Sequence, residues 1–280
     1  MAATADLRIQ VVLTIAGSDP SGGAGIQADL KTFTALGVYG ASVITALTAQ
    51  NTRGVSGVLG IPADFIGQQI DAVASDLNIR AVKTGMLGDT ATVDAVVAGL
   101  TRHGFETVIV DPVMVATSGD VLLAPDAIDA VRTRLIPHAT LITPNLHEAA
   151  KLLGSSVATN LAGMEDQGRQ LLDLGAGAVL LKGGHAAGDE AIDVLVTPIR
   201  ISHVKAPRIA TRNTHGTGCT LSAAIAANMA MGLDLENAVQ EGKLFLSKAL
   251  KSAACQTLGA GCGPVNHLCD IPFRLTSGGL

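Results

Sequence analysis

The chain has 280 residues, a formal net charge of −5 and almost no aromatic side chains, with five Phe, one Tyr and no Trp. Hydrophobic residues make up 48% and charged residues 15% of the chain. This composition excludes intrinsic disorder, which requires low hydrophobicity and high net charge, and without aromatic shelves or a basic balance we expect no nucleic-acid partner.

Membrane insertion and secretion are also not expected. No apolar run reaches the ~18 residues that a membrane-spanning helix needs, and the first residues lack the pattern of a secretory signal. The cysteines, Cys219, Cys255, Cys262 and Cys269, contain no CxxC pair and are too sparse for a disulfide scaffold. For the last three, incidental thiols are favoured over a metal site, and their role is left open. We predict a cytoplasmic location.

Short β-branched runs alternate with helical patterns along the chain. In chain order we predict a strand at 11–15, a helix at 26–36, a strand at 43–48, a helix at 63–77, a strand at 81–83, a helix at 90–103, a strand at 107–110, a helix at 124–135, a strand at 140–143, helices at 146–153 and 164–174, and a strand at 178–182. Continuous apolar strands separated by helices indicate a parallel sheet that is covered on both faces.

The order of elements changes near the end of the chain. Residues 192–196 and 200–204 are predicted to form an antiparallel pair joined across Thr197 and Pro198. Helices at 217–231 and 235–252 follow, and the last ~20 residues are rich in turn formers and are expected to be a packed or frayed tail. We therefore predict one three-layer α/β domain over 1–280, with a core at about 9–257.

The strongest motif is the glycine-rich segment NTHGTGC at 213–219. Gly216 and Gly218 flank Thr217 and permit a tight turn whose backbone N–H groups point one way. A helix that begins there adds the positive end of its dipole. Such a turn suits the charge that develops on a phosphoryl group in transfer. An ordinary glycine-rich turn before a packed helix is the alternative.

Cys219 lies in the first turn of that predicted helix. The field of a helix N-terminus lowers the pKa of a thiol, so we expect a lowered pKa here. A partly ionised thiol beside an anion site could accept a proton from an attacking hydroxyl group. Because an unpaired Cys is usually a small buried hydrophobe, a purely structural role stays open.

Two acidic motifs follow other predicted strands. Asp111 ends one strand, and Asn145 and Glu148 follow the next. Carboxylates and an amide suit Mg²⁺, which takes few protein ligands and keeps several waters. The alternatives are a turn at Asp111, which precedes a proline, and a capping box formed by Asn145 and Glu148.

The remaining candidates concern nucleotide binding. The first turn, at 16–25, contains neither GxGxxG nor GK[ST], so a dinucleotide or Walker-type site is not supported. Its glycines suit a loop whose backbone touches a small ligand. Lys182 ends another strand and could contact nucleotide phosphates, although a solvated lysine is an alternative. Thr214 and His215 of the glycine-rich segment are assigned to the nucleotide as well.

Five segments taken together resemble one protein family. They are TIAGSDPSGGAGIQADLKTF at 14–33, TGML at 84–87, DPVMVATSG at 111–119, TPNLHEA at 143–149 and NTHGTGCTLSA at 213–223. In this order they resemble the hydroxymethylpyrimidine/phosphomethylpyrimidine kinases of thiamine biosynthesis, of the ribokinase-like superfamily. The likeness runs from about 13 to 242. It implies a three-layer α/β/α ribokinase-like fold and a homodimer.

The resemblance also implies an activity and its cofactors. These kinases transfer phosphoryl groups from ATP with Mg²⁺ to 4-amino-5-hydroxymethyl-2-methylpyrimidine and then to its monophosphate; use of a monovalent cation is left open. By position, Cys219 takes the place of the catalytic Asp of sugar kinases, and Gly216, Thr217 and Gly218 receive the phosphoryl group. The pyrimidine pocket implied by the resemblance consists of Gln50, Met86, Val113, Gly17, Ala24 and Asp29.

Two other functions stay open. Some pyridoxal kinases share this framework but carry a second Cys in the loop after the Asp-Pro-Val-Met block, where this chain has Val115, Ala116, Thr117 and Ser118. A non-catalytic ligand-binding protein is the third reading, although such a protein should have lost part of the anion turn or of the acidic set. His147 and Cys262 depart from the family pattern without touching the expected chemistry.

Overall fold

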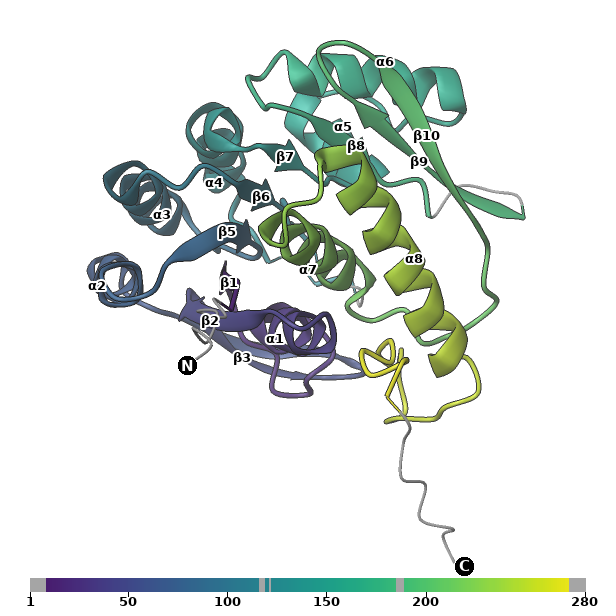
Figure 1. Cartoon of the computed structure of the whole chain (residues 1–280), viewed down its shortest axis with the longest axis horizontal. Helices are drawn as coiled ribbons and strands as arrows, with labels where there is room; N and C mark the ends of the chain where they lie inside the picture. Colours follow the sequence, from purple (N-terminus) through teal and green to yellow (C-terminus); the bar gives the residue numbers. More distant parts are fainter. Residues whose placement is uncertain (1–8, 116–118, 121, 185–188, 272–280) are drawn as a thin grey trace, which may run out of the picture.

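The centre of the molecule is an eight-stranded sheet with the order β10-β9-β8-β7-β6-β5-β1-β2 (Figure 1). The computed structural model describes residues 9–115, 119–120, 122–184 and 189–271. Six strands run parallel: β1 (Val11–Ala16), β2 (Tyr39–Ile44), β5 (Ile79–Thr84), β6 (Val108–Val110), β7 (Leu141–Ile142) and β8 (Val179–Leu181). The pair β9 (Glu190–Val196) and β10 (Ile201–Pro207) is antiparallel, as predicted.

Helices cover both faces of this sheet. One layer contains α1 (Gly25–Ala35), α7 (Thr217–Ala230) and α8 (Leu235–Ala253). The other contains α2 (Ala63–Ala74), α3 (Thr90–His103), α4 (Pro125–Ala130), α5 (Leu146–Leu153) and α6 (Leu161–Leu172). The predicted helix at 124–135 is α4 continued by a π-helical turn, η1 (Val131–Leu135), and a 3₁₀ turn, η2 (Ile136–His138), follows. The three-layer α/β/α architecture with a mostly parallel sheet is thereby confirmed.

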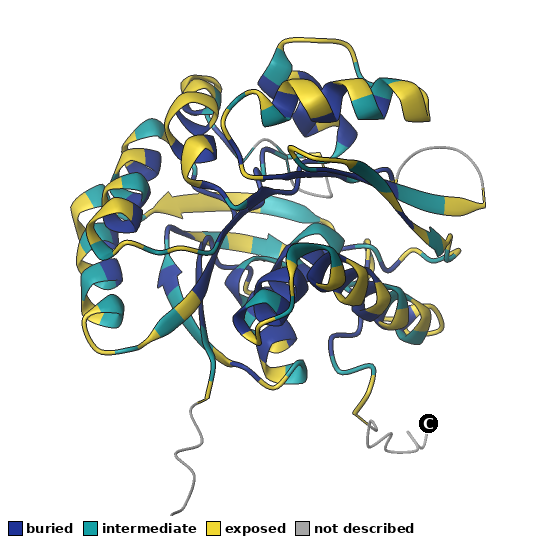
Figure 2. Ribbon diagram, turned by 45° about the horizontal axis from the view of Figure 1, so that its top comes forward, coloured by how far each residue is buried: buried dark blue, intermediate teal, exposed yellow. Residues whose placement is uncertain are grey.

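Strand burial follows from this layering. Side chains of a strand point alternately to opposite faces, and Leu13 and Ile15 of β1 pack into one apolar core whereas Val12 packs into the other. Because both faces are covered, β1 is apolar at successive positions and gives no alternating pattern. On the second face, the buried alanines of α7 present a smooth surface to the sheet, and α7 is buried over most of its length after the first turn (Figure 2).

The prediction of one strand at 43–48 is wrong. β2 ends at Ile44, and the chain continues as β3 (Ala46–Asn51), which pairs with β4 (Gly54–Gly60) in a separate two-stranded sheet. Thr45 fixes the break, since its N–H bonds to the Ala16 carbonyl and its hydroxyl to the Met86 carbonyl at 2.7 Å. The glycines of β4 and its exposed apolar side chains, such as Leu59, give no core-facing pattern that could have predicted it.

The segment after α8 packs against the start of α7. Val265 and His267 are buried, and Pro264 pairs with His215 in an isolated β-bridge. His267 Nε2 lies 3.0 Å from the hydroxyl oxygen of Thr220 in α7. The tail was expected to be packed or frayed, and this part of it is packed. No helix in the described ranges is both long and apolar enough to cross a membrane.

The buried His267 is expected to make stability sensitive to acid. Burial lowers the pKa of His267 to about 4, with Lys31 and His215 acting in the same direction. An unfolded chain binds the proton near pH ~6.5, so folding loses stability as pH falls below that value. Between pH 7 and 5 the loss should reach about 2 kcal/mol. Urea unfolding of the wild type and of His267→Gln at both pH values measures it.

The matched control is His138→Gln, which removes an exposed histidine. We expect the wild type and His138→Gln to lose the same free energy of unfolding on acidification, and His267→Gln to lose less. An equal pH dependence in all three proteins would contradict a neutral, buried His267.

Candidate active site

The carboxyl ends of the parallel strands meet at one edge of the sheet, where the strand order reverses. From β1 the chain crosses to β2 on one side, and later β5 pairs with β1 on the other side. Ligands of open parallel sheets bind at such a switch point. The N-terminal part of α7 packs over the same strands, since α7 contacts β1, β5 and β6. This edge is therefore the candidate site.

The first turn of α7 lies directly against the loop after β1. Gly216, the N-cap of α7, has a φ of 79°, and a Cβ there would overlap the carbonyl oxygen of Gly23. A Cβ on Gly23 would in turn overlap the His215 ring. Both positions therefore need glycine because two backbones approach closely. A helix places unpaired N–H groups and the positive end of its dipole at its start, so the start of α7 at this edge suits an anion.

Cys219 lies at the N-terminal ends of two helices. It belongs to the first turn of α7, and its sulfur accepts a hydrogen bond from the backbone N–H of Gly25, the first residue of α1. Burial nevertheless raises the pKa of the Cys219 thiol to about 11, although the charge of Lys83 opposes the rise. The expectation of a lowered thiol pKa is wrong, because desolvation outweighs both helix termini.

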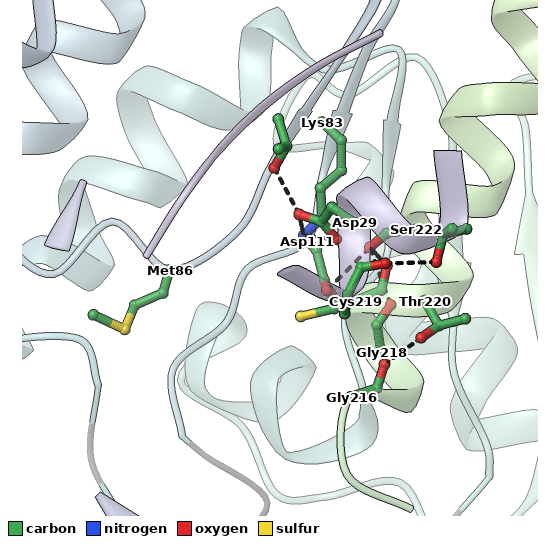
Figure 3. A network of polar contacts seen from close by, with 12 residues as sticks. Asp29, Lys83, Met86, Asp111, Gly216, Gly218, Cys219, Thr220 and Ser222 are labelled. Carbon is green, nitrogen blue, oxygen red and sulfur yellow. Dashed lines mark hydrogen bonds and ion pairs between the residues drawn. The ribbon is translucent and has the colours of Figure 1, made fainter. Parts of the chain in front are cut away.

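A buried ion pair lies beneath this thiol. Lys83 Nζ is 3.0 and 2.9 Å from the two carboxylate oxygens of Asp29, and the Thr14 hydroxyl donates to the same carboxylate at 2.6 Å (Figure 3). Burial favours a neutral amine, but the Asp29 carboxylate raises the pKa of Lys83 above its ordinary value. Asp29 is fully buried. Its carboxylate holds Lys83 in place, and its place in the pyrimidine pocket stays a prediction.

Asp111 organises the next group of side chains. One carboxylate oxygen accepts from Lys182 Nζ at 2.9 Å and from the Thr143 hydroxyl at 3.1 Å, and the other accepts from Ser222 of α7 at 3.2 Å. Burial by itself favours the protonated acid, but the cations of Lys182 and Lys83 hold the pKa of Asp111 below its usual value. Lys182 is thus paired with Asp111 and is not the solvated lysine of the alternative interpretation.

Asn145 and Glu148 form the capping box of α5. The Asn145 side-chain oxygen accepts from the N–H groups of His147 and Glu148, both at 2.9 Å, and Glu148 Oε2 accepts from the Asn145 N–H at 2.8 Å. Burial raises the pKa of Glu148 to about 7, and the charge of Asp111 adds to this effect while Lys182 opposes it. The capping box that was the alternative interpretation is therefore formed. Glu148 also interacts electrostatically with Asp111 and Lys182.

The predicted pyrimidine-pocket residues are distributed around this edge. Gly17 lies against Met86, since a Cβ on Gly17 would be 3.2 Å from Met86 Cε. Val113 lines a narrow crevice beside Gly85 and Asp111. Ala24 is the N-cap of α1. Residues 116–118, in the loop that distinguishes the pyridoxal kinases, lie outside the described part of the chain.

Gln50 lies at the other end of the site, on β3. Its side-chain oxygen is 3.2 Å from the Thr48 hydroxyl, which itself donates to the carbonyl of Ser18 at 2.8 Å. Gln50 also lines a cavity of about 420 Å³ together with His215. The site therefore has one end at Gln50 and His215 and another at the cluster of Asp111, Lys182 and Glu148. The charge of Asp111 raises the pKa of both Lys83 and Cys219.

Asp19 is a central residue of the site that sequence reasoning missed. Its carboxylate accepts from the N–H groups of Ser21, Gly23 and Ala24 and lies 2.8 Å from His215 Nε2. Burial opposes its ionisation, but these hydrogen bonds, that of His215 first, lower the pKa of Asp19 to about 2. Only the Asp-Pro-Ser turn signal was available from sequence. His215 and Thr214, assigned to the nucleotide, thus lie beside the loop after β1, which His215 anchors.

The geometry defines a class of protein. The sheet is doubly wound, and its switch point receives a helix N-terminus, a paired lysine and two carboxylates. This is the ribokinase-like arrangement of a phosphotransferase. The profile of the phosphomethylpyrimidine kinase family matches residues 19–266. The chain belongs to this family and is a kinase.

Similar proteins agree in sequence and in fold. The chain is 53% identical to a hydroxymethylpyrimidine/phosphomethylpyrimidine kinase of Rhizobium meliloti, over 92% of this chain and 96% of that one. It is 54% identical to the Escherichia coli protein of the same name, over 91% and 96%. Among solved structures, phosphomethylpyrimidine kinase from Clostridium difficile has a TM-score of 0.77 at 43% identity, covering 87% of this chain and 100% of that one. Bacillus subtilis pyridoxal kinase in an ADP complex has a TM-score of 0.87 at 35% identity, covering 94% and 99%.

Proposed function

We propose that the chain phosphorylates 4-amino-5-hydroxymethyl-2-methylpyrimidine and then converts the monophosphate to the diphosphate, with ATP as donor, as a step of thiamine biosynthesis. The observation that carries this proposal is the position of Cys219, in the first turn of α7 and hydrogen-bonded to the first N–H of α1. The similar kinases of Rhizobium meliloti and Escherichia coli, whose names contain both substrates, support it.

The first transfer asks for positioning more than for covalent chemistry. The hydroxymethyl oxygen of the pyrimidine attacks the γ-phosphorus of ATP, a new P–O bond forms, and the bond to the bridging oxygen of ADP breaks. The N–H groups at the start of α7, from Gly216 to Cys219, receive the negative charge on the phosphoryl oxygens. Cys219 orients the hydroxyl group, and its sulfur accepts the proton in the thiolate form.

Mg²⁺ is proposed to bind with the nucleotide phosphates, at Asp111 and through water at Glu148. Within the described ranges no three His, Cys, Asp or Glu side chains gather in a metal-binding group, so the chain itself offers this carboxylate pair. Such a donor set fits Mg²⁺, which takes one or two carboxylates and completes its shell with phosphates and waters. When bound, the ion neutralises phosphate charge. Lys182 adds a fixed positive charge next to Asp111.

The pyrimidine ring is proposed to lie between Met86 and Val113, with Gly17 and Ala24 at its edge. The amide of Gln50 can both donate and accept, which suits a ring nitrogen beside an amino group. Scarce aromatic residues do not prevent this mode of binding, because thioether and aliphatic groups can enclose a ring without an aromatic shelf.

We also propose a cytoplasmic homodimer. Leu47 and Leu59 of the two-stranded β3–β4 sheet are exposed, the latter by 65%, and an unpartnered apolar face of this kind suits an interface. Light scattering coupled to size-exclusion chromatography measures the mass, and a monomer at micromolar concentration would oppose this assembly.

Product analysis is the experiment that tests the proposed activity. The protein is incubated with Mg-ATP and the hydroxymethylpyrimidine, and monophosphate and diphosphate are separated over time. Pyridoxal is run beside it, since pyridoxal kinases are among the similar structures. We expect sequential formation of both pyrimidine phosphates and little pyridoxal phosphate. Turnover of pyridoxal alone would support the second candidate, and absence of turnover with every substrate would overturn both.

A further inference from the structure

The cavity beside Gln50 is built from three segments that are distant in sequence. It has a volume of about 420 Å³ and is lined by the β3–β4 turn, by the residues before α7 and by the segment after α8: Gln50, Asn51, Thr52, Arg53, Arg212, His215, Gly261 and Cys262. This volume lies within the range of small-ligand sites, roughly 300–1,000 Å³. Polar and charged side chains are among the lining residues.

Close backbone contacts fix the shape of this cavity. The Gly261 N–H donates to the Thr52 hydroxyl at 3.1 Å, and a Cβ on Gly261 would overlap the Thr52 carbonyl oxygen. His215 exchanges backbone hydrogen bonds with the same late segment, from its N–H to Gly263 and from the Val265 N–H to its carbonyl. The β3–β4 turn and the start of α7 are therefore held by one loop.

The charge of the cavity wall is positive. Arg53 and Arg212 are both lining residues, and no acidic residue is among them. Across the described ranges no acidic side chain forms a salt bridge with either guanidinium group. The nearby carboxylate of Asp19 is already engaged by backbone N–H groups and by His215. Two unpaired guanidinium groups at one cavity suit a phosphate, which they can bind in a bidentate manner.

The cavity reaches the start of α7, since His215 on its wall directly precedes Gly216, the N-cap of that helix. After the first transfer the new phosphate occupies the Gly216–Cys219 turn. For the second transfer a fresh ATP must bring its γ-phosphoryl group there, so the ester phosphate has to move aside while staying within reach. A neighbouring cationic cavity stabilises the displaced dianion.

We propose, on the basis of the proposed function, that this cavity binds the phosphate of the pyrimidine monophosphate when the ester serves as acceptor, with Arg53 and Arg212 as its ligands. In the second transfer a non-bridging oxygen of the ester attacks the γ-phosphorus. A P–O–P linkage forms, the bond from the γ-phosphorus to the bridging oxygen breaks, and ADP leaves. The neutral hydroxymethylpyrimidine uses Gln50 of the cavity wall but does not need the two arginines.

Arg53→Gln, Arg212→Gln and the double variant test the site, with Arg80→Gln as an exposed control at the opposite end of β5. Initial rates are measured with the alcohol and, separately, with the monophosphate as acceptor. We expect each single variant to raise KM for the monophosphate about 10-fold and the double variant to raise it further, while KM for the alcohol stays within about 2-fold. Time courses that begin from the alcohol should then accumulate monophosphate.

Calorimetric binding of the monophosphate without ATP gives a readout that is independent of turnover. Wild-type affinity should fall with added salt and should be weakened in the double variant. Unchanged binding of the monophosphate to the double variant, an equal rise of both acceptor KM values, or a rise in KM for ATP would each overturn this site. Absence of pyrimidine turnover in the wild type would instead refute the proposed function, so the two failures are distinguishable.

Discussion

Replacement of Cys219 by Ala is expected to lower kcat at least ~100-fold, as for loss of a general base, while pyrimidine binding stays nearly intact. The thiol lies at the start of α7 and accepts the Gly25 N–H, so its removal leaves the attacking hydroxyl without its neighbouring acceptor. Because burial raises the pKa of Cys219 to about 11, little thiolate is present in the free enzyme at neutral pH. Steady-state kinetics of Cys219→Ala and the wild type measure the loss.

The pH profile provides the discriminating measurement. If the thiolate is the active form, kcat/KM of the wild type should rise with pH between about 7 and 9, because this parameter reports ionisations of the free enzyme. The profile of Cys219→Ala should lack that rise. Cys255→Ala is the control, since Cys255 is exposed. An unchanged kcat in Cys219→Ala would remove the thiol from the mechanism.

Replacement of Asp111 by Asn is expected to reduce kcat/KM by about 100-fold or more. The carboxylate accepts from Lys182, Thr143 and Ser222 and faces the second lysine, Lys83. Its neutralisation leaves buried positive charge uncompensated and withdraws the main proposed ligand of Mg²⁺. A loss of about 3 kcal/mol in transition-state stabilisation corresponds to roughly 100-fold in rate.

Rates measured over a range of Mg²⁺ concentrations separate the two contributions. A rightward shift of the Mg²⁺ dependence in Asp111→Asn indicates lost metal binding, whereas a fall in melting temperature reports the unpaired lysines. Asp234→Asn is the matched control, because Asp234 caps α8 away from the site. Wild-type rates and Mg²⁺ dependence in Asp111→Asn would exclude Asp111 from metal binding.

The central layers of the fold could be predicted from sequence because burial imposes a simple pattern. A strand that is covered on both faces, such as β1, is continuously apolar, and the helices between strands carry one apolar face. The antiparallel β9–β10 pair was predictable from its short turn. β3 and β4 were not, because they cover no core and their side chains and glycines therefore carry no periodic signal.

Individual residues of the site could be predicted from sequence, but the contacts between them could be predicted less well. Loops that follow parallel strands must meet at one edge, so Asp111, Lys182 and the turn before α7 were identifiable by position. The Asp19–His215 contact joins residues that are 196 positions apart, and no local pattern encodes it. The direction of the Cys219 pKa shift also depends on how much of the thiol is desolvated, which only the packed structure shows.

Because Asp19 and His215 are far apart in sequence, their contact can form only late in translation. At translation rates of about 5–20 residues per second, the 196 residues between these partners take roughly 10–40 s to synthesise. Until then the loop after β1 lacks its contact with His215, and the β1–β5 edge lacks the covering start of α7. Ligand binding should therefore appear late in synthesis, and ribosome-bound fragments that end before His215 should bind neither nucleotide nor pyrimidine.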